Sequence, residues 1–310
     1  MSLPADGRNE SSLAGLGALV LAAAHRAGVD PHGLRALRQH SNSVWLLTSS
    51  AVVVRLATTA DAPARAARAV AITRWLDSAG FPCTRPLDIE QPIHLDEPPA
   101  VATFWEYLPQ PQSWLPDPTA LGRIVRDLHS HTTPPITVPS LAPMDRLRAA
   151  IAMDTARPAP VLPTGDRAWL LDRASDLLAG YRHLSTPLGT GLVHSDVHLG
   201  NLLSDTRRHR AVLGDWDSAT IGPREWDLVV IAADDRFGLP RQDRSAFADA
   251  YGYDVTTWPS WTLLRELREL HSLAAHIRRA PNSPPATAEL AHRVASLRAA
   301  DRSIRWHGIN

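Results

Sequence analysis

The amino-acid sequence predicts an α+β protein in which a small, sheet-containing N-terminal part precedes a larger, mostly helical C-terminal part. Two observations predict this class. Short β-branched and apolar runs occur before residue 109, and patterns with helical spacing dominate after residue 118. The chain has 310 residues, of which 44% are hydrophobic and 21% charged, so it is long enough for two parts that each bury a core.

The N-terminal elements follow from local patterns. A first helical pattern ends at Gly28, which tolerates the left-handed conformation of a helix C-cap. Two apolar runs separated by Thr48, Ser49 and Ser50 predict paired strands. The predicted N-terminal elements are a helix over 12–28, strands over 44–47 and 52–56, a helix over 62–79 and a strand over 100–108.

A proline-rich connection over residues 110–119 predicts the boundary between the two parts, which we place at 1–107 and 108–310. Helical patterns follow it, interrupted by prolines, and strands return only near residue 200. The predicted C-terminal elements are a helix over 119–131, further helical segments to residue 185, strands at 192–193, 202–203 and 211–214, and helices over 262–280 and 287–305.

Composition excludes several classes of function. Lys+Arg and Asp+Glu are equal at 32 each, so no basic field predicts binding to nucleic acid or to a membrane surface. The apolar run over residues 13–24 is too short to span a bilayer. The single cysteine, Cys83, excludes an internal disulfide and favours a cytoplasmic protein. The chain contains no lysine, so every site that needs a strong cation must use arginine.

Polar side chains are dense over residues 194–217, HSDVHLGNLLSDTRRHRAVLGDWD. His194, Asp196 and Asn201 form the pattern H-x-D-x-x-x-x-N, and Asp215 follows a short strand pattern. A hairpin between them would bring Asp215 opposite Asn201. Carboxylate and amide oxygens suit Mg²⁺, and Asp196 beside that metal could orient and deprotonate a hydroxyl group for in-line attack.

A second interpretation of this stretch is a metal site. His194, Asp196 and His198 alternate, and on a strand all three would lie on one face. Gly200 and Asn201 favour a loop instead, and the sequence offers no second histidine and carboxylate cluster.

The strings HSDVHLGN, LGDWD and EWDL resemble those of the aminoglycoside phosphotransferase family, whose members share a two-lobed protein-kinase-like fold. The resemblance implies phosphorylation of a small-molecule hydroxyl group with ATP or GTP and Mg²⁺. It further implies that Asp196 is the catalytic base, that Asn201 and Asp215 bind Mg²⁺, that His194 supports the catalytic loop and that Asp227 anchors this loop by hydrogen bonds.

The same resemblance implies nucleotide contacts in the N-terminal lobe. They lie at Ser43, in the polar SNSVW stretch that occupies the place of a glycine-rich loop, and at the hinge residues Trp105, Glu106 and Tyr107. The family has a phosphate-binding lysine paired with a helix glutamate. Arg55 takes the place of that lysine, and Ala69 takes the place of the glutamate.

The acceptor molecule is less well indicated. By resemblance, Asp234 and Asp235 would hold a cationic small molecule such as an aminoglycoside or an amino sugar, although a solvated helix end explains them equally well. Because the lysine and the glutamate are both replaced, a catalytically impaired nucleotide- or metabolite-binding module is the alternative. A protein kinase is disfavoured, since only about a dozen residues separate Asp215 from Asp227. The oligomeric state is not indicated.

Overall fold

The computed structural model describes residues 7–39, 43–131 and 133–308, which form two compact units. The first unit contains the residues up to Leu115 together with Pro134–Thr137 and Asn201–Ser218. The second unit contains Pro116–Thr133, Val138–Gly200 and the residues from Ala219 onward.

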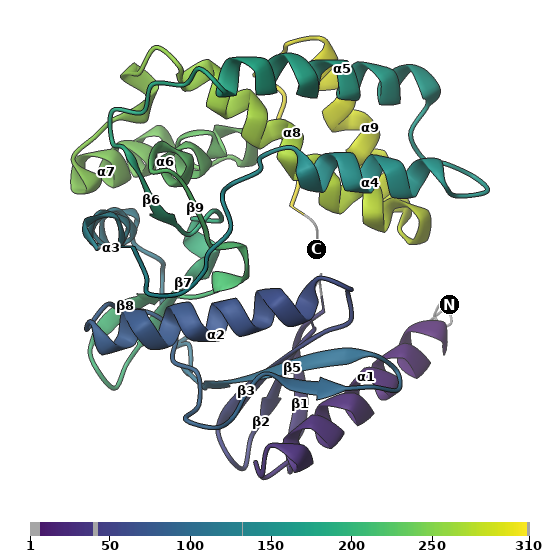
Figure 1. Ribbon diagram of the computed structural model, residues 1–310, viewed down its shortest axis with the longest axis vertical. Helices are drawn as coiled ribbons and strands as arrows, with labels where there is room; N and C mark the ends of the chain where they lie inside the picture. Colours follow the sequence, from purple (N-terminus) through teal and green to yellow (C-terminus); the bar gives the residue numbers. More distant parts are fainter. Residues whose placement is uncertain (1–6, 40–42, 132, 309–310) are drawn as a thin grey trace. The chain divides into compact units, whose positions relative to one another are not determined.

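The helices, strands and short 3-10 helices alternate in the first unit, whereas helices dominate the second (Figure 1). The helices are α1 Gly7–Arg26, α2 Ala62–Ser78, α3 Pro118–Ser130, α4 Asp145–Thr155, α5 Thr164–Tyr181, α6 Glu225–Ala232, α7 Arg241–Tyr251, α8 Trp261–Arg279 and α9 Pro284–Arg298. The strands are β1 Leu34–Gln39, β2 Ser43–Leu47, β3 Val52–Ala57, β4 Ile93–Leu95, β5 Ala100–Glu106, β6 Thr190–Val193, β7 Leu202–Asp205, β8 Arg210–Leu213 and β9 Thr220–Pro223. The 3-10 helices are η1 Leu199–Asn201, η2 Trp216–Ser218, η3 Asp234–Phe237, η4 Val255–Thr257 and η5 Ala280–Asn282.

An antiparallel sheet in the order β1-β2-β3-β5-β4 forms the first unit's framework. Because side chains alternate along a strand, Val52, Val54 and Leu56 of β3 face one side, where they pack with Val20 and Ala24 of α1. Figure 1 shows α1 lying along this sheet. One face of the sheet is therefore an apolar core.

The opposite face of β3 carries Arg55 and Ala57. These side chains line a pocket together with Ala62 and Ala66 of α2 and Thr103 of β5. The period of the strand thus directs Arg55 away from the α1 core and toward α2.

The hairpin of β7 and β8 belongs to the first unit. Leu213 at the end of β8 donates its N–H to the carbonyl of Pro82 and accepts from the N–H of Thr84, at 2.9 and 3.1 Å. These bonds join the hairpin to the chain that follows α2. This grouping differs from the predicted boundary between 107 and 108, because contacts formed after residue 200 return this segment to the first unit.

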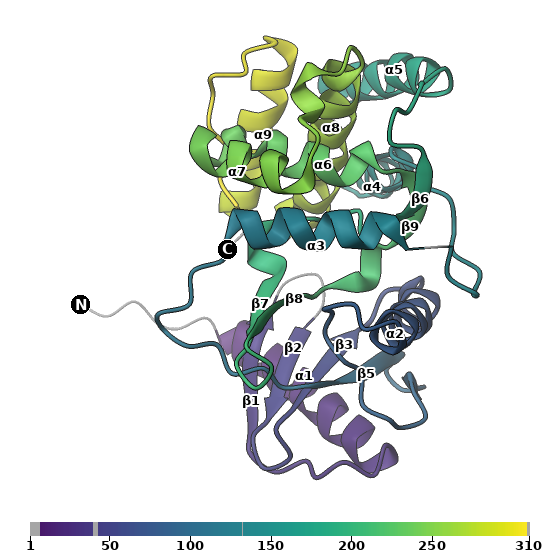
Figure 2. The same cartoon turned by 90° about the vertical axis from the view of Figure 1, so that its left-hand side faces the viewer.

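In the second unit α8 packs against α4, α5, α6 and α9, and Figure 2 shows this group of helices with α7 and α3 beside it. The buried side chains of α8, such as Leu264, Leu267 and Ile277, recur at helical spacing. Strand β6, which pairs antiparallel with β9, ends just before the loop that begins at His194. None of the described helices is both long and apolar enough to cross a membrane.

Most predicted elements are confirmed within a few residues, and Gly28 has the left-handed φ of 67° expected after α1. Strands β1, β4 and β9 were not predicted. Strand β1, LRALRQ, is rich in arginine and its residues 35–37 are exposed, so it lacks an apolar alternation. The helix predicted over 287–305 ends at Arg298, because the residues after Ala300 turn back along the unit.

The close approach of α3 and α7 yields a stability test. A Cβ atom at Gly122 would lie 2.5 Å from the carbonyl oxygen of Phe247 and 3.0 Å from the Cβ of Ala250. We expect Gly122→Ala to lower the free energy of unfolding by about 1–3 kcal/mol, measured by urea denaturation. Gly165→Ala in α5 is the control, because a Cβ there meets nothing within 4 Å. Equal stabilities for the two variants would show that the helices can separate without cost.

Candidate active site

The loop that begins at His194 is fixed by a buried carboxylate. Asp227, in the first turn of α6, is fully buried. The N–H of His194 donates to its Oδ2 at 2.8 Å, and the N–H of Ser195 donates to its Oδ1 at 2.7 Å. Ser195 has a φ of 67°, so the chain turns sharply at this point. The predicted anchoring of the loop by hydrogen bonds to Asp227 is therefore confirmed.

A histidine that the sequence did not single out completes this anchor. His129 of α3 donates from Nε2 to Asp227 Oδ2 at 3.1 Å, and its Nδ1 lies 2.8 Å from the hydroxyl of Tyr251 in α7. Burial, and then the charge of Asp227, raise the pKa of Tyr251 well above its usual value, so the hydroxyl stays protonated and can donate to His129. Three helices therefore contribute to the position of one loop.

Asp196, the predicted base, forms an ion pair with Arg268 of α8. Arg268 Nη2 donates to Asp196 Oδ1 at 2.7 Å, and its Nη1 donates to the carbonyl of Ser195 at 3.3 Å. Burial alone would raise the pKa of Asp196, but the charge of Arg268 holds that pKa well below its usual range. The carboxylate is thus ionised and oriented, as a group that accepts a proton from a hydroxyl must be.

His194 and His198 have different surroundings. The His194 side chain is fully buried, whereas that of His198 is 37% exposed, with Nε2 at 3.8 Å from Asp196 Oδ2. Residues 194–198 do not form a strand, so the alternation on which the rival metal site depends is missing. Across the part of the chain that the structure describes, no group of three or more His, Cys, Asp or Glu side chains could hold a metal ion.

The proposed Mg²⁺ ligands meet at one end of the β7–β8 hairpin. Leu202 pairs with Leu213, and the N–H of Gly214 donates to the carbonyl of Asn201 at 2.9 Å. Asp215 follows directly, with a φ of 62°. The predicted hairpin is confirmed, and it places the backbone of Asn201 next to that of Asp215. Asn201 and Asp215 belong to the first unit, whereas Asp196 belongs to the second.

This pair of residues fits a magnesium ion in its chemistry. A carboxylate and an amide supply hard oxygen ligands, and Mg²⁺ usually completes its six ligands with waters and phosphate oxygens.

Arg55, at the lysine's place, binds two carboxylates. Its Nη2 donates to Asp215 Oδ1 at 2.7 Å and to Asp217 Oδ2 at 2.9 Å. Burial would lower the pKa of Arg55, but the charges of the two aspartates raise it, so the guanidinium remains charged. Ala69, which takes the place of the family's glutamate, is buried. The α2 residues that line the pocket beside Arg55 are Ala62, Arg65 and Ala66.

The N–H groups of the predicted hinge residues already donate hydrogen bonds within the fold. Trp105 is 5% exposed, and its indole N–H donates to Thr103 at 2.8 Å. The N–H of Glu106 donates to the carbonyl of Arg85, and that of Tyr107 donates to the carbonyl of Ala51. The amides of Glu106 and Tyr107 are therefore already bonded within the fold, and a nucleotide contact at this hinge stays a prediction.

The stretch that replaces a glycine-rich loop is only partly described. Ser41 and Asn42 lie outside the described residues. Ser43 is 7% exposed and accepts a hydrogen bond from the indole of Trp45 at 3.0 Å. A nucleotide contact from Ser43 stays a prediction.

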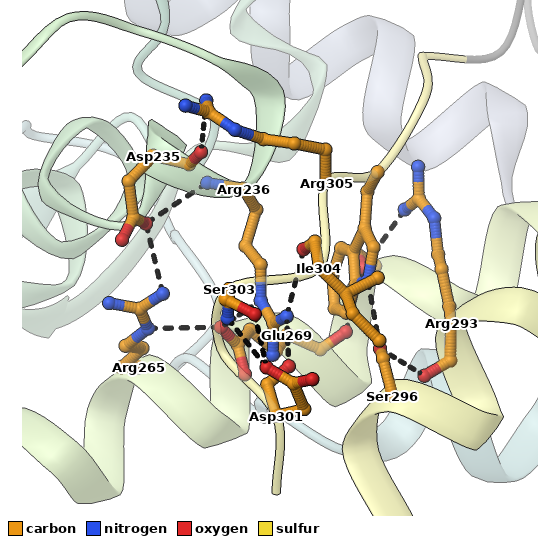
Figure 3. Close-up of polar contacts among 12 residues, drawn as sticks. Asp235, Arg236, Arg265, Glu269, Arg293, Ser296, Asp301, Ser303, Ile304 and Arg305 are labelled. Atoms are coloured by element: carbon orange, nitrogen blue, oxygen red, sulfur yellow. Dashed lines mark hydrogen bonds and ion pairs between the residues drawn. The ribbon is translucent and has the colours of Figure 1, made fainter. Parts of the chain in front are cut away.

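The two candidate substrate residues have different roles in the fold. Asp235 accepts from Arg265 Nη2 at 2.9 Å and from the N–H of Arg236 at 3.0 Å. Figure 3 shows Asp235 within a network that continues through Glu269 to the C-terminal segment. Burial raises the pKa of Asp234 to about 7, although the charge of Arg268 opposes this shift. Asp235 is thus held by Arg265 and the amide of Arg236, and a substrate contact from either aspartate stays a prediction.

A sequence profile of the phosphotransferase enzyme family matches residues 33–267, about three quarters of the chain. No curated protein sequence matches it. Among solved structures, an amicoumacin kinase in complex with AMP-PNP, Ca²⁺ and Ami superimposes with a TM-score of 0.68 at 14% identity, over 90% of this chain and 91% of that one.

Two further structures are similar in the same way. A choline/ethanolamine kinase family protein from Mesorhizobium loti has a TM-score of 0.63 at 17% identity, over 93% of this chain and 94% of that one. A microcompartment-associated aminopropanol kinase has a TM-score of 0.63 at 19% identity, over 95% and 99%. At such identities the likeness shows the fold, and the predicted protein-kinase-like fold is confirmed.

The anchor at Asp227 can be tested by Asp227→Asn. The amide keeps one acceptor oxygen, so His194 or Ser195 must lose its hydrogen bond. We expect the free energy of unfolding to fall by about 3 kcal/mol and the amide protons of these two residues to lose protection in hydrogen exchange. Asp249→Asn on the exposed face of α7 is the control. Unchanged protection at both amides would contradict the anchoring role.

The half-buried Asp234 gives a pH-dependent prediction. Its folded pKa of about 7 exceeds the usual value of 3.8, so the folded state retains a proton that the unfolded state loses, and stability falls as pH rises from about 4 to 7. Asp234→Asn should remove this loss. We expect the variant to gain roughly 2–4 kcal/mol over wild type at pH 8 relative to pH 4, measured by urea unfolding, because the folded and unfolded pKa values differ by about 3. A difference independent of pH would show that Asp234 is not perturbed.

Proposed function

We propose that this chain, which belongs to the phosphotransferase enzyme family, transfers the terminal phosphoryl group of ATP or GTP to a hydroxyl group of a small molecule, with Mg²⁺ as cofactor. The observation that carries the proposal is the ionised Asp196, fixed by Arg268 on a loop whose preceding amides are bound by the buried Asp227. A merely structural loop would not need a charged carboxylate held in this way.

Asp196 would orient the acceptor. Its carboxylate accepts a hydrogen bond from the hydroxyl, whose oxygen attacks the terminal phosphorus while the bond to the bridging oxygen breaks and ADP or GDP leaves. The hydroxyl proton passes to the carboxylate. Because the pKa of Asp196 is held low by Arg268, its carboxylate is a weak base. It therefore acts chiefly by orienting the hydroxyl, and it takes the proton late, when the bond from the hydroxyl oxygen to phosphorus has largely formed and that oxygen has become less basic.

Asn201 and Asp215 would hold Mg²⁺, which would supply positive charge to offset the negative charge of the phosphates. Arg55 would donate to the phosphates from the side of the sheet that faces α2. The hinge near Glu106 would bind the purine ring, and the chain's preference between ATP and GTP depends on its carbonyl and amide groups there.

The acceptor is proposed to be a hydroxylated compound with an amino group, such as an aminoglycoside, an amino sugar or an amino alcohol. Asp234 supports this class, because a cation bound beside it would favour the charged carboxylate. Asp235 supports it less, since Arg265 already neutralises its charge. The similar structures include an aminopropanol kinase, a choline kinase and a spectinomycin phosphotransferase.

The direct test is release of ADP or GDP with Mg²⁺ across a panel of aminoglycosides, other hydroxylated antibiotics, amino sugars and amino alcohols. Release stimulated by one class supports the proposal and identifies the acceptor chemistry. Binding of Mg²⁺ and nucleotide without stimulated release by any compound would favour the alternative, a catalytically impaired nucleotide- or metabolite-binding module.

Two variants separate the proposed roles. Asp196→Ala should lower kcat by a factor of about 10² or more with little change in nucleotide affinity, because its carboxylate acts on the acceptor. Asp215→Ala should weaken the Mg²⁺ dependence of nucleotide binding, measured by isothermal titration calorimetry. If Asp196→Ala retained most of its turnover, the base would have to be another residue.

A further inference from the structure

Helix α2 offers no carboxylate to Arg55. Its only acidic residue is Asp77, near its C-terminal end, which forms an ion pair with Arg85 at 2.7 Å. The α2 residues that line the pocket beside Arg55 are two alanines and Arg65. A second cation there would repel the guanidinium unless a negative charge lay between them.

Asp217 supplies that charge from a different element. Its Oδ2 lies 2.9 Å from Arg55 Nη2 and 3.9 Å from Arg65 Nη2. The side chains of Asp217 and Arg55 are each 15% exposed, so this ion pair is largely removed from water. A desolvated pair holds its geometry better than a surface pair, because water competes less for either partner.

The turn that presents Asp217 is itself fixed. Trp216 in η2 is 1% exposed, its indole N–H donates to the carbonyl of Leu213 at 2.9 Å, and its ring packs edge-on against Phe81 with centroids 5.8 Å apart. The anchored tryptophan separates two aspartates, Asp215 and Asp217, that both reach Arg55 Nη2. Both contacts use one nitrogen, so Nε and Nη1 can donate to other oxygens.

We infer that Asp217 is the positioning residue for Arg55, doing from η2 what a glutamate on the following helix does for a lysine. The inference rests on the proposed function, in which Asp215 turns to Mg²⁺ and Arg55 turns to the nucleotide phosphates. Asp217 then keeps the guanidinium in place after Asp215 has a new partner. A planar guanidinium that lacked this restraint would have many orientations to lose on binding.

The inference predicts a selective loss of phosphate recognition. In titration calorimetry with Mg²⁺, Asp217→Ala should weaken ATP binding about tenfold or more, because a charge-assisted hydrogen bond that orders Arg55 is removed. Adenosine has no phosphates, so its affinity should stay within about twofold of wild type. Asp96→Ala is the matched control, since this aspartate of the same unit has a side chain that is 87% exposed.

Coupling between the two residues distinguishes positioning from a general effect on the fold. In a double-mutant cycle with Arg55→Ala, the losses of ATP affinity should not add, because Asp217 acts only through Arg55. Ala66→Glu in the Asp217→Ala background should recover part of the lost affinity, since Ala66 lines the same pocket and would restore a carboxylate from α2.

Three results would overturn the inference: wild-type ATP affinity in Asp217→Ala, an equal loss for ATP and adenosine, or additive losses in the cycle. If the wild-type chain itself bound no Mg²⁺ and ATP, the proposed function would fail and the inference with it. Binding by the wild type with no selective loss in the variant would overturn the inference alone.

Discussion

One buried carboxylate sets the geometry on which the second unit's chemistry depends. Asp227 has no exposed surface, so it needs partners for its lone pairs, and it takes them from the amides of His194 and Ser195 and from the ring of His129. These bonds fix the start of the loop that carries Asp196. Arg268, from another helix, then fixes the carboxylate itself. The position of Asp196 is thus determined by contacts with α3, α6 and α8 rather than by the loop alone.

The first unit shows how a chain without lysine can hold an arginine at the place where the family has a lysine. The family profile supports the predicted class of enzyme for this chain, an ATP-dependent small-molecule kinase. Arginine at position 55 has a planar, charged head that requires restraint, and the structure provides two aspartates that flank the buried Trp216. Replacement of the lysine and of the helix glutamate is therefore compatible with phosphoryl transfer, since η2 provides a carboxylate that α2 does not.

The sequence predicted the fold well where patterns were local. Strong apolar periodicity gave the long helices, and the turn residues gave the hairpins. It did not indicate Arg268 or His129, because each meets its partner across about seventy or more residues, and nothing local distinguishes the arginine that pairs with Asp196 from the others on α8. Asp217 could have been noticed in the LGDWD string, but only the coordinates show it beside Arg55. Asp235, predicted as a substrate residue, forms an ion pair with Arg265, a partner that the local sequence did not indicate.

Phosphorus-31 NMR tests the central claim most directly. Wild-type protein would be incubated with Mg²⁺, ATP and each acceptor class, and the γ-phosphate followed. The account predicts that, with one class, this resonance declines while a phosphomonoester and ADP appear in equal amounts. Two results would contradict phosphoryl transfer to an acceptor. One is release of the γ-phosphate only as inorganic phosphate. The other is no consumption of ATP, or of GTP in its place, with any acceptor.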